Sequence, residues 1–162
     1  MSAPAFAVGT ESDPPKPSET TTQCTDGEVW DANTESCVPP EESTEDQAAI
    51  FQDARELAWF GDADEAVRVL DTLPTDDLVL TYRGFLARLS GDWLAAESYY
   101  QAALKMNPDN ILARSYYGQG LAEIGEIALA EAQLSEIRRR GGRQTWAELA
   151  LRLTLSRAEP AY

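Results

Sequence analysis

The sequence predicts an all-α fold made of repeated helix pairs, preceded by a disordered tail that carries a small cysteine hairpin. A glycine followed by an acidic residue recurs at intervals of 30 and then 34 residues, and each pair is followed at the same offset by an alanine. Larger or apolar residues stand four and seven positions beyond that alanine, which is the spacing of one buried helix face. The three sets are Gly61-Asp62 with Ala66, Leu70 and Leu73; Gly91-Asp92 with Ala96, Tyr100 and Ala103; and Gly125-Glu126 with Ala130, Leu134 and Ile137.

The first 23 residues are interpreted as the remnant of an export signal followed by a flexible linker. Residues 1–7 read MSAPAFA, and Ala5-Phe6-Ala7 has the small-x-small spacing of a signal-peptidase site, so cleavage is expected after Ala7. Residues 8–23 combine proline, serine, threonine and acidic residues with almost nothing to bury, which predicts disorder. Export would place the protein in the periplasm or outside a bacterial cell. The alternative is the short disordered start of a cytoplasmic protein.

Residues 24–46 are predicted to form a small disulfide hairpin followed by an acidic linker. Asp26-Gly27 and residues 31–34 are turn signals on either side of Val29 and Trp30. In an exported protein Cys24 and Cys37 would pair and close a 14-residue loop, which stabilises it by about 3 kcal/mol on the chain-entropy argument. Since the hairpin lies outside the repeats, the disulfide is expected to stabilise the hairpin alone.

The acidic residues of this loop raise the alternative of a calcium site. Their spacing lacks the order of an EF-hand loop, and two cysteines are too few for a structural zinc site, so no metal is expected. The candidate oxygen ligands are Asp26, Glu28, Asp31, Asn33 and Glu35.

The middle copy of the repeat, residues 77–110, resembles the tetratricopeptide repeat. It has the small residues Gly84 and Ala96, the large Tyr100, and Pro108 just past its second helix. The resemblance covers about residues 47–142 within a domain of residues 47–162. It implies a short right-handed α-solenoid of three helix pairs, with repeats at about 47–76, 77–110 and 111–144.

The outer copies depart from the pattern. Leu73-Pro74 ends the second helix of the first copy early, and Gly141-Gly142 replaces the closing proline of the third. No copy has the tryptophan that opens the family pattern. Small residues precede each glycine–acid pair by seven positions, where two helices must approach closely: Ala54, Gly84 and Gly118.

A last helix over residues 145–158 is predicted to close the stack. Thr145 is a good helix cap. Trp146, Leu149, Ala150 and Leu153 follow at i, i+3, i+4 and i+7, so we expect these side chains to cover the apolar face that a stack of repeats leaves open.

The resemblance implies binding rather than catalysis, because the first helices of such arrays line a concave groove that receives a protein or peptide. Aromatic anchors with arginines suit a peptide bearing a carboxylate. The alternative for each aromatic residue is packing against neighbouring helices. Arg55 and Arg88 are the stronger candidates for ligand contact. The predicted groove residues are Phe51, Arg55 and Trp59; Thr81, Phe85 and Arg88; and Ser115, Gln119 and Ala122.

The expected function is a non-catalytic scaffold or adaptor of the bacterial cell envelope. The alternative is cell-wall or polysaccharide binding through the Cys24 to Cys37 hairpin, with the repeats as a spacer. A carboxylate-pair enzyme, such as a glycosidase, would need two acids in a supported cleft. The acids here fall at predicted helix caps and on outer faces.

Composition excludes several other functions. The chain has 28 acidic and 13 basic residues, and its net charge of −15 argues against a nucleic-acid partner. It has no histidine, which removes histidine-based nucleophiles and acid–base catalysis, and no cofactor is expected. No segment is apolar enough to span a membrane. The one basic cluster, residues 138–140 with Arg143, suits a helix C-terminus or contact with an anionic partner.

Overall fold

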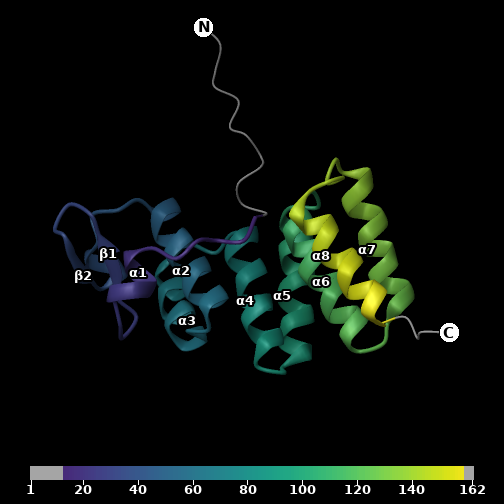
Figure 1. Cartoon of the computed structure of the whole chain (residues 1–162), viewed down its shortest axis with the longest axis horizontal. Coiled ribbons are helices and arrows are strands. Elements are labelled where there is room, and N and C mark those ends of the chain that lie inside the picture. Colours follow the sequence, from purple (N-terminus) through teal and green to yellow (C-terminus); the bar gives the residue numbers. More distant parts are fainter. Residues whose placement is uncertain (1–12, 159–162) are drawn as a thin grey trace, which may run out of the picture. The chain divides into compact units, whose positions relative to one another are not determined.

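The computed structural model describes residues 13–158, and the predicted cleavage site after Ala7 lies outside them. Within this range the protein has eight α-helices and a small two-stranded sheet (Figure 1). The helical class is confirmed, with the sheet as an addition to it. The elements are α1 (Glu19–Gln23), β1 (Val29–Asp31), β2 (Ser36–Val38), the 3₁₀-helix η1 (Pro40–Glu42), α2 (Gln47–Phe60), α3 (Ala63–Thr72), α4 (Asp77–Leu89), α5 (Trp93–Met106), α6 (Ile111–Glu123), α7 (Ile127–Arg139) and α8 (Trp146–Ala158).

The chain divides into two compact units. One comprises Pro15–Pro108, and the other is the Asp109–Tyr162 unit, which contains α6, α7 and α8. Residues 24–46, which the sequence suggested were a separate small module, belong to the same unit as the first two helix pairs.

In the Pro15–Pro108 unit, the glycine–acid pairs are the turns between paired helices. Gly61 and Gly91 have φ values of +101° and +83°, a backbone conformation that glycine adopts without strain. Asp92 then caps α5 by accepting the Ala95 N–H at 3.0 Å. These turns let α2 pair with α3 and α4 pair with α5.

Each pair closes on the predicted residues. Ala66, Leu70, Ala96 and Tyr100 are fully buried. The close approach at Gly84 is real, because a Cβ built there would lie only 2.6 Å from Cε1 of Tyr100. The absence of a side chain at Gly84 therefore makes room for the ring.

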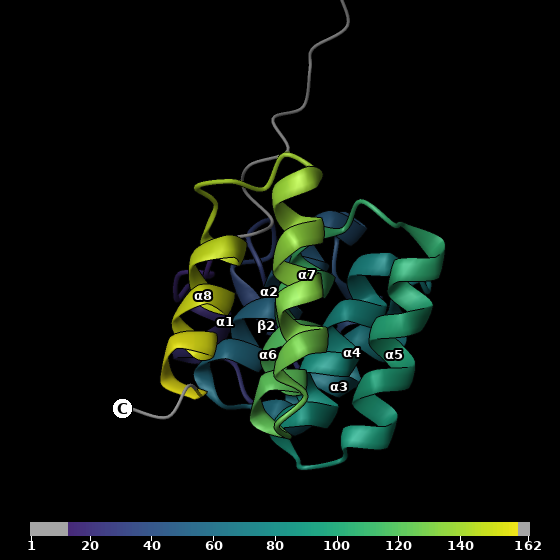
Figure 2. The ribbon, with the colours of Figure 1, turned by 90° about the vertical axis from the view of Figure 1, so that its right-hand side faces the viewer.

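The second unit contains the third helix pair and the last helix. Gly125 has a φ of +87° and ends α6, and Ala130, Leu134 and Ile137 on α7 are buried as predicted. Helix α8 packs against both α6 and α7, and Figure 2 shows the three helices side by side. All seven helices predicted from residue 47 onward are present.

The predicted packing face of α8 is wrong. Its buried apolar residues are Ala147, Leu151 and Leu155, whereas Leu149 and Leu153 are 48% and 47% exposed. The reason lies on α6, where a Cβ at Gly118 would lie 2.7 Å from Cδ2 of Leu151. Leu151 fills the space that the glycine leaves, and this contact fixes the rotation of α8.

The linker predicted before the hairpin is also corrected in its described part. Residues 19–23 form α1, a five-residue helix capped by Ser18, whose side chain accepts the Thr20 N–H. So short a helix is not stable by itself in water. It persists because side chains of α2 bind it, through contacts set out in the next subsection.

Candidate functional site

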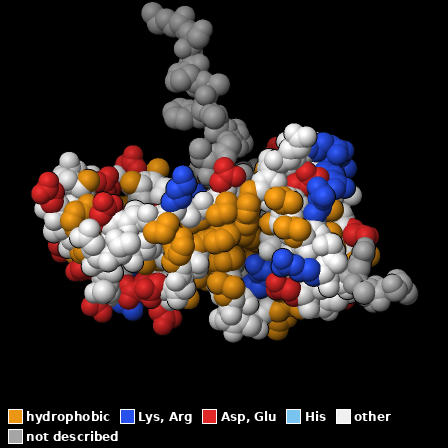
Figure 3. All heavy atoms as spheres, viewed as in Figure 1, with side chains coloured by type: hydrophobic (Ala, Val, Ile, Leu, Met, Phe, Trp, Pro, Cys, Tyr) orange, Lys and Arg blue, Asp and Glu red, His pale blue; other side chains and the backbone are white. Residues whose placement is uncertain are grey.

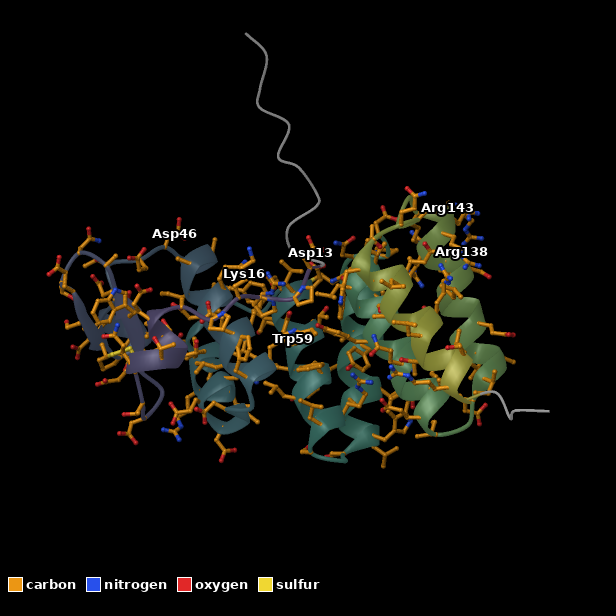
Figure 4. All side chains as sticks on the ribbon, in the orientation of Figure 1. Asp13, Lys16, Asp46, Trp59, Arg138 and Arg143 are labelled. Carbon is orange, nitrogen blue, oxygen red and sulfur yellow. A yellow bond between two sulfur atoms is a disulfide. The ribbon has the colours of Figure 1, made fainter. Side chains whose placement is uncertain are left out.

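The aromatic residues predicted to line the groove form a cluster between α2 and α4. The Trp59 and Phe85 rings stack with centroids 6.2 Å apart, and Tyr82 meets both Phe51 and Phe85 edge to face. Phe51 and Phe85 are 7% and 8% exposed, so they act mainly as packing residues. Trp59 is half-buried and presents part of its ring to solvent (Figure 4). Hydrophobic side chains gather over α4 on the face drawn in Figure 3.

The two candidate arginines have different environments. Arg55 is 3% exposed, and its Nε donates to Tyr82 Oη at 3.0 Å while Nη1 donates to Gln52 Oε1 at 2.5 Å. Arg55 therefore joins α2 to α4 from within the packed region. Arg88 is half-buried, and its Cζ lies 5.8 Å from the centroid of the Phe85 ring, within the range of a cation–π contact.

The other predicted groove residues are largely covered. Thr81 is fully buried, and its Oγ1 donates to the Asp77 carbonyl oxygen at 2.6 Å. Ser115 is also fully buried, because its Oγ donates to the Ala147 carbonyl oxygen of α8 at 2.7 Å. Half-buried Gln119 donates to Ser115 Oγ at 3.1 Å, and Ala122 is buried. In the Pro15–Pro108 unit, the predicted groove residues with more than slight exposure are Trp59 and Arg88.

Cys24 and Cys37 form the predicted disulfide. Strands β1 and β2 pair antiparallel with Trp30 opposite Cys37. Val29 on β1 is fully buried. Acidic side chains gather over this hairpin on the face drawn in Figure 3.

The hairpin is anchored to the first helix pair, contrary to the expectation that it stands alone. The main-chain N–H of Gly27 donates to the Glu65 carboxylate on α3. Thr20 Oγ1 donates to Asp53 Oδ1 on α2 at 2.8 Å and accepts the N–H of Trp30 at 3.0 Å. The disulfide therefore constrains a segment that is part of the helical unit.

A second carboxylate of α2 holds the start of α1. Glu56 is 7% exposed, and its Oε2 accepts the Ser18 N–H at 3.0 Å, the Ser18 hydroxyl at 2.8 Å and the Thr21 hydroxyl at 3.1 Å. Burial raises the pKa of Asp53 to about 6. The negative charges of Glu56 and Glu45 act in the same direction, and the hydrogen bond from Thr20 acts in the opposite direction.

Asp31, one of the candidate calcium ligands, has a different role. Its Oδ1 accepts the N–H groups of Asn33 and Thr34, both at 2.9 Å, and its Oδ2 accepts the N–H and hydroxyl of Thr44 at 2.5 and 2.7 Å. These bonds, led by those from Thr44, hold the pKa of Asp31 far below its usual value. The carboxylate thus ties the hairpin turn to the segment leading into α2. Among residues 13–158, no group of three or more acidic or cysteine side chains is arranged to hold a metal ion.

A surface groove of about 360 Å³ lies beside the contact between the hairpin and α3. Hairpin residues, η1 and α3 all contribute to it, and its lining carries more acidic than basic side chains. The lining residues are Asp26, Gly27, Glu28, Pro39, Pro40, Glu41, Arg68, Asp71 and Thr72.

The basic cluster at the end of α7 is partly neutralised by ion pairs within its own unit. Arg138 and Arg143 of this cluster are labelled in Figure 4. Arg138 Nε donates to Glu148 Oε1 at 2.6 Å, while Arg139 and Arg140 both bind Glu136. Arg140 also pairs with Asp109. These pairs support the interpretation of the cluster as a cation-rich helix C-terminus.

Sequence reasoning missed the carboxylates that organise the hairpin: Asp31, Asp53, Glu56 and Glu65. Each looks like an ordinary surface acid in the sequence, since its partners are main-chain N–H groups and hydroxyls up to 38 positions away. The run of hydroxyl residues at 18–22 was the available signal, but such runs are equally typical of disordered linkers.

Comparison of the chain with protein-family models, curated proteins and solved structures finds no match. Across residues 13–158, no helix has the length and apolar character needed to cross a membrane.

Proposed function

We propose that this protein is an exported, non-catalytic scaffold or adaptor related to the tetratricopeptide-repeat family, and that it binds a protein or peptide on the inner faces of its first helices. Three helix pairs joined by glycine–acid turns support the family assignment. The right-handed solenoid and its concave groove are part of this proposal.

The observation that carries the proposal is that Trp59 and Arg88 both contact Phe85. These residues come from the first helices of adjacent pairs, and both lie against the Phe85 ring. A partly exposed indole and a partly exposed guanidinium that share the Phe85 ring offer apolar contact and a charge-assisted hydrogen bond to one ligand. A peptide with an aromatic or aliphatic side chain next to a carboxylate fits this chemistry.

The disulfide supports export. Disulfides persist in oxidising compartments such as the bacterial periplasm and are rare in the cytoplasm. The Cys24–Cys37 bond is the one disulfide in the chain, and it involves both cysteines of the sequence.

The test compares the full chain with two matched double variants. Each is crosslinked to its partners in the source cell, and the amount of partner protein recovered with it is measured. Trp59→Ala/Arg88→Glu should reduce recovery of the partner at least about tenfold, or about 1.4 kcal/mol. Leu94→Ala/Lys105→Glu is the control, because both residues are exposed on the second helix α5. Equal capture by the two variants would rule out the first-helix face. Arg55 is left intact, since reversing a buried charge would damage the fold.

The hairpin alternative is tested by substitution instead of deletion. Removing residues 8–46 would strip α2 and α3 of their bonds to Thr20 and Gly27, so loss of binding after deletion would not identify the hairpin as the site. Trp30 is half-buried, and Trp30→Ala keeps its main-chain bond to Thr20. Binding to peptidoglycan that is lost in Trp30→Ala and retained in Trp59→Ala/Arg88→Glu would favour the cell-wall function.

A further inference from the structure

We propose that the outer face of α8 is a docking site for an acidic amphipathic helix of a partner protein. This surface lies in the Asp109–Tyr162 unit and is additional to the first-helix face of the proposed function. Three features of the unit lead to it: an apolar stripe, a groove beside the stripe, and a set of arginines without ion pairs.

The stripe consists of Trp146, Leu149 and Leu153, which recur at i, i+3 and i+7 on α8; the two leucines are exposed, and Trp146 lies at the edge of the packed face. The two leucines are 48% and 47% exposed. The indole of Trp146 is held edge to face by Tyr116, with ring centroids 6.0 Å apart, so its half-exposed surface is fixed in place before any partner arrives. The stripe runs for about 10 Å along the helix axis.

A groove of about 370 Å³ runs beside this stripe. Its lining combines the apolar surface with polar groups at the start of α8: Gln144, Thr145, Trp146, Glu148, Leu149 and Arg152. A straight apolar stripe beside a groove is the surface against which a second helix packs, because ridges of side chains on one helix fill grooves on the other.

The charge around the groove selects an acidic occupant. Glu148 is already engaged, since it accepts Arg138 Nε at 2.6 Å and the Gln144 N–H at 2.7 Å. Arg143, Arg152 and Arg157 are exposed and form no ion pair with any residue from 13 to 158. Arg152 lines the groove, Arg143 directly precedes its lining residue Gln144, and Arg157 follows on the same helix, in a protein whose net charge is −15.

The same charges disfavour a second copy of α8 as the occupant. Pairing two α8 helices would bring arginine-rich faces together, and like charges facing each other destabilise a contact. A helix with leucines on one side and carboxylates on both flanks fits the stripe and the arginines together.

The test uses two labelled synthetic peptides of about 18 residues, long enough to form a helix on binding. Both carry leucines on one helical face, and the flanking positions are glutamate in one peptide and lysine in the other. Fluorescence anisotropy with the full chain should show saturable binding of the glutamate peptide, at least about tenfold tighter than the lysine peptide and weakened by salt. Leu149→Ser/Leu153→Ser should weaken binding at least about tenfold.

Matched control variants distinguish binding at this site from nonspecific hydrophobic binding. Leu129→Ser removes a leucine that is 51% exposed on α7 of the same unit and should leave affinity unchanged. Arg143→Glu/Arg152→Glu should abolish the preference for the glutamate peptide. Trp59→Ala/Arg88→Glu should have no effect, so failure of the first-helix function and failure of this proposal are distinguishable.

Three outcomes would overturn the proposal. They are absence of saturable binding up to about 1 mM, equal affinity for the two peptides, and an equal loss of binding in Leu129→Ser. Sedimentation equilibrium supplies a fourth. A dimer that disappears in Leu149→Ser/Leu153→Ser would make a second copy of the chain the occupant.

Discussion

Thr20 Oγ1 donates a hydrogen bond to Asp53 Oδ1 at 2.8 Å, and through this bond α1 is joined to α2. The same hydroxyl oxygen accepts the N–H of Trp30, so one side chain joins α1, β1 and α2. Thr20 is 1% exposed. A threonine from a segment with the composition of a linker is therefore one of the buried contacts that make the hairpin and the helices a single unit.

The contact of the α1–hairpin segment with α2 and α3 should become more stable as pH falls from about 7 to 4. The pKa of Asp53 is raised from an ordinary 3.8 to about 6, so between these values the folded unit binds a proton that the unfolded chain does not. Stability must then fall as pH rises through this window. Hydrogen exchange of the amides in α1 and β1 at pH 5 and pH 7.5 measures the effect, with greater protection free energy expected at pH 5.

Asp53→Asn provides the matched variant. Asparagine keeps an oxygen for the Thr20 hydroxyl and carries no charge, so the variant should be more protected than the native chain at pH 7.5 and equal to it near pH 4. A pH dependence in Asp53→Asn equal to that of the native chain would assign the effect to another group.

The stability of the Asp109–Tyr162 unit should instead decrease as pH falls, and it should do so below pH 4.5. Hydrogen bonds from Arg138 and the Gln144 N–H lower the pKa of Glu148 below its usual 4.5. Its contribution to stability is therefore complete above pH 4.5 and is lost as pH falls through the lowered pKa. The protection free energy of the Gln144 amide and of the hydrogen-bonded amides of α8 should fall on acidification below pH 4.5 in the native chain and much less in Glu148→Gln.

Breaking the disulfide should destabilise the first helix pair as well as the hairpin. Cys24→Ser/Cys37→Ser removes the covalent link between two residues that are 13 positions apart in the sequence. On the chain-entropy argument this lowers the free energy of unfolding by about 3 kcal/mol. Because Gly27 and Thr20 are bonded to α3 and α2, faster amide exchange is expected in those helices. Exchange in α7 is the internal reference and should not change. An effect confined to residues 24–37 would contradict the coupling.

Adding one methyl group at Gly84 should cost about 1–3 kcal/mol of unfolding free energy. The new Cβ of Gly84→Ala would lie 2.6 Å from a ring carbon of Tyr100, which is fully buried and has no room to move away. Urea denaturation monitored by circular dichroism measures the change. Ala87→Gly serves as a comparison, because it alters helix propensity on α4 without adding volume and should cost about 1 kcal/mol or less.

Repetition made the helices predictable. The glycine–acid pairs give the turns, and the alanines behind them give the buried faces of α3, α5 and α7, because both follow from local backbone geometry and helix period. The rotation of α8 was not predictable in the same way. Apolar residues occur on both sides of this helix, and the choice between Leu149 and Leu151 depends on the space beside Gly118.

Helix period assigns the candidate-site residues to one side of their helices, but it does not decide their exposure. Arg55 and Phe85 both contact the aromatic cluster between α2 and α4. Whether such a residue is accessible depends on its neighbours, and Tyr82 engages Arg55 within the packed region. Trp59 and Arg88 retain exposure. Contacts between positions far apart in the chain decide this difference, and no local pattern encodes them.

The anchoring of the hairpin has a consequence for the order in which the protein is assembled. The two cysteines precede α2 and α3 in the chain and are only 13 positions apart, so their bond can close before those helices have formed. Asp53, Glu56 and Glu65, which hold the segment in place, all follow it in the chain. The loop can therefore reach its native position only after α2 and α3 have been made, whether or not its disulfide has already closed.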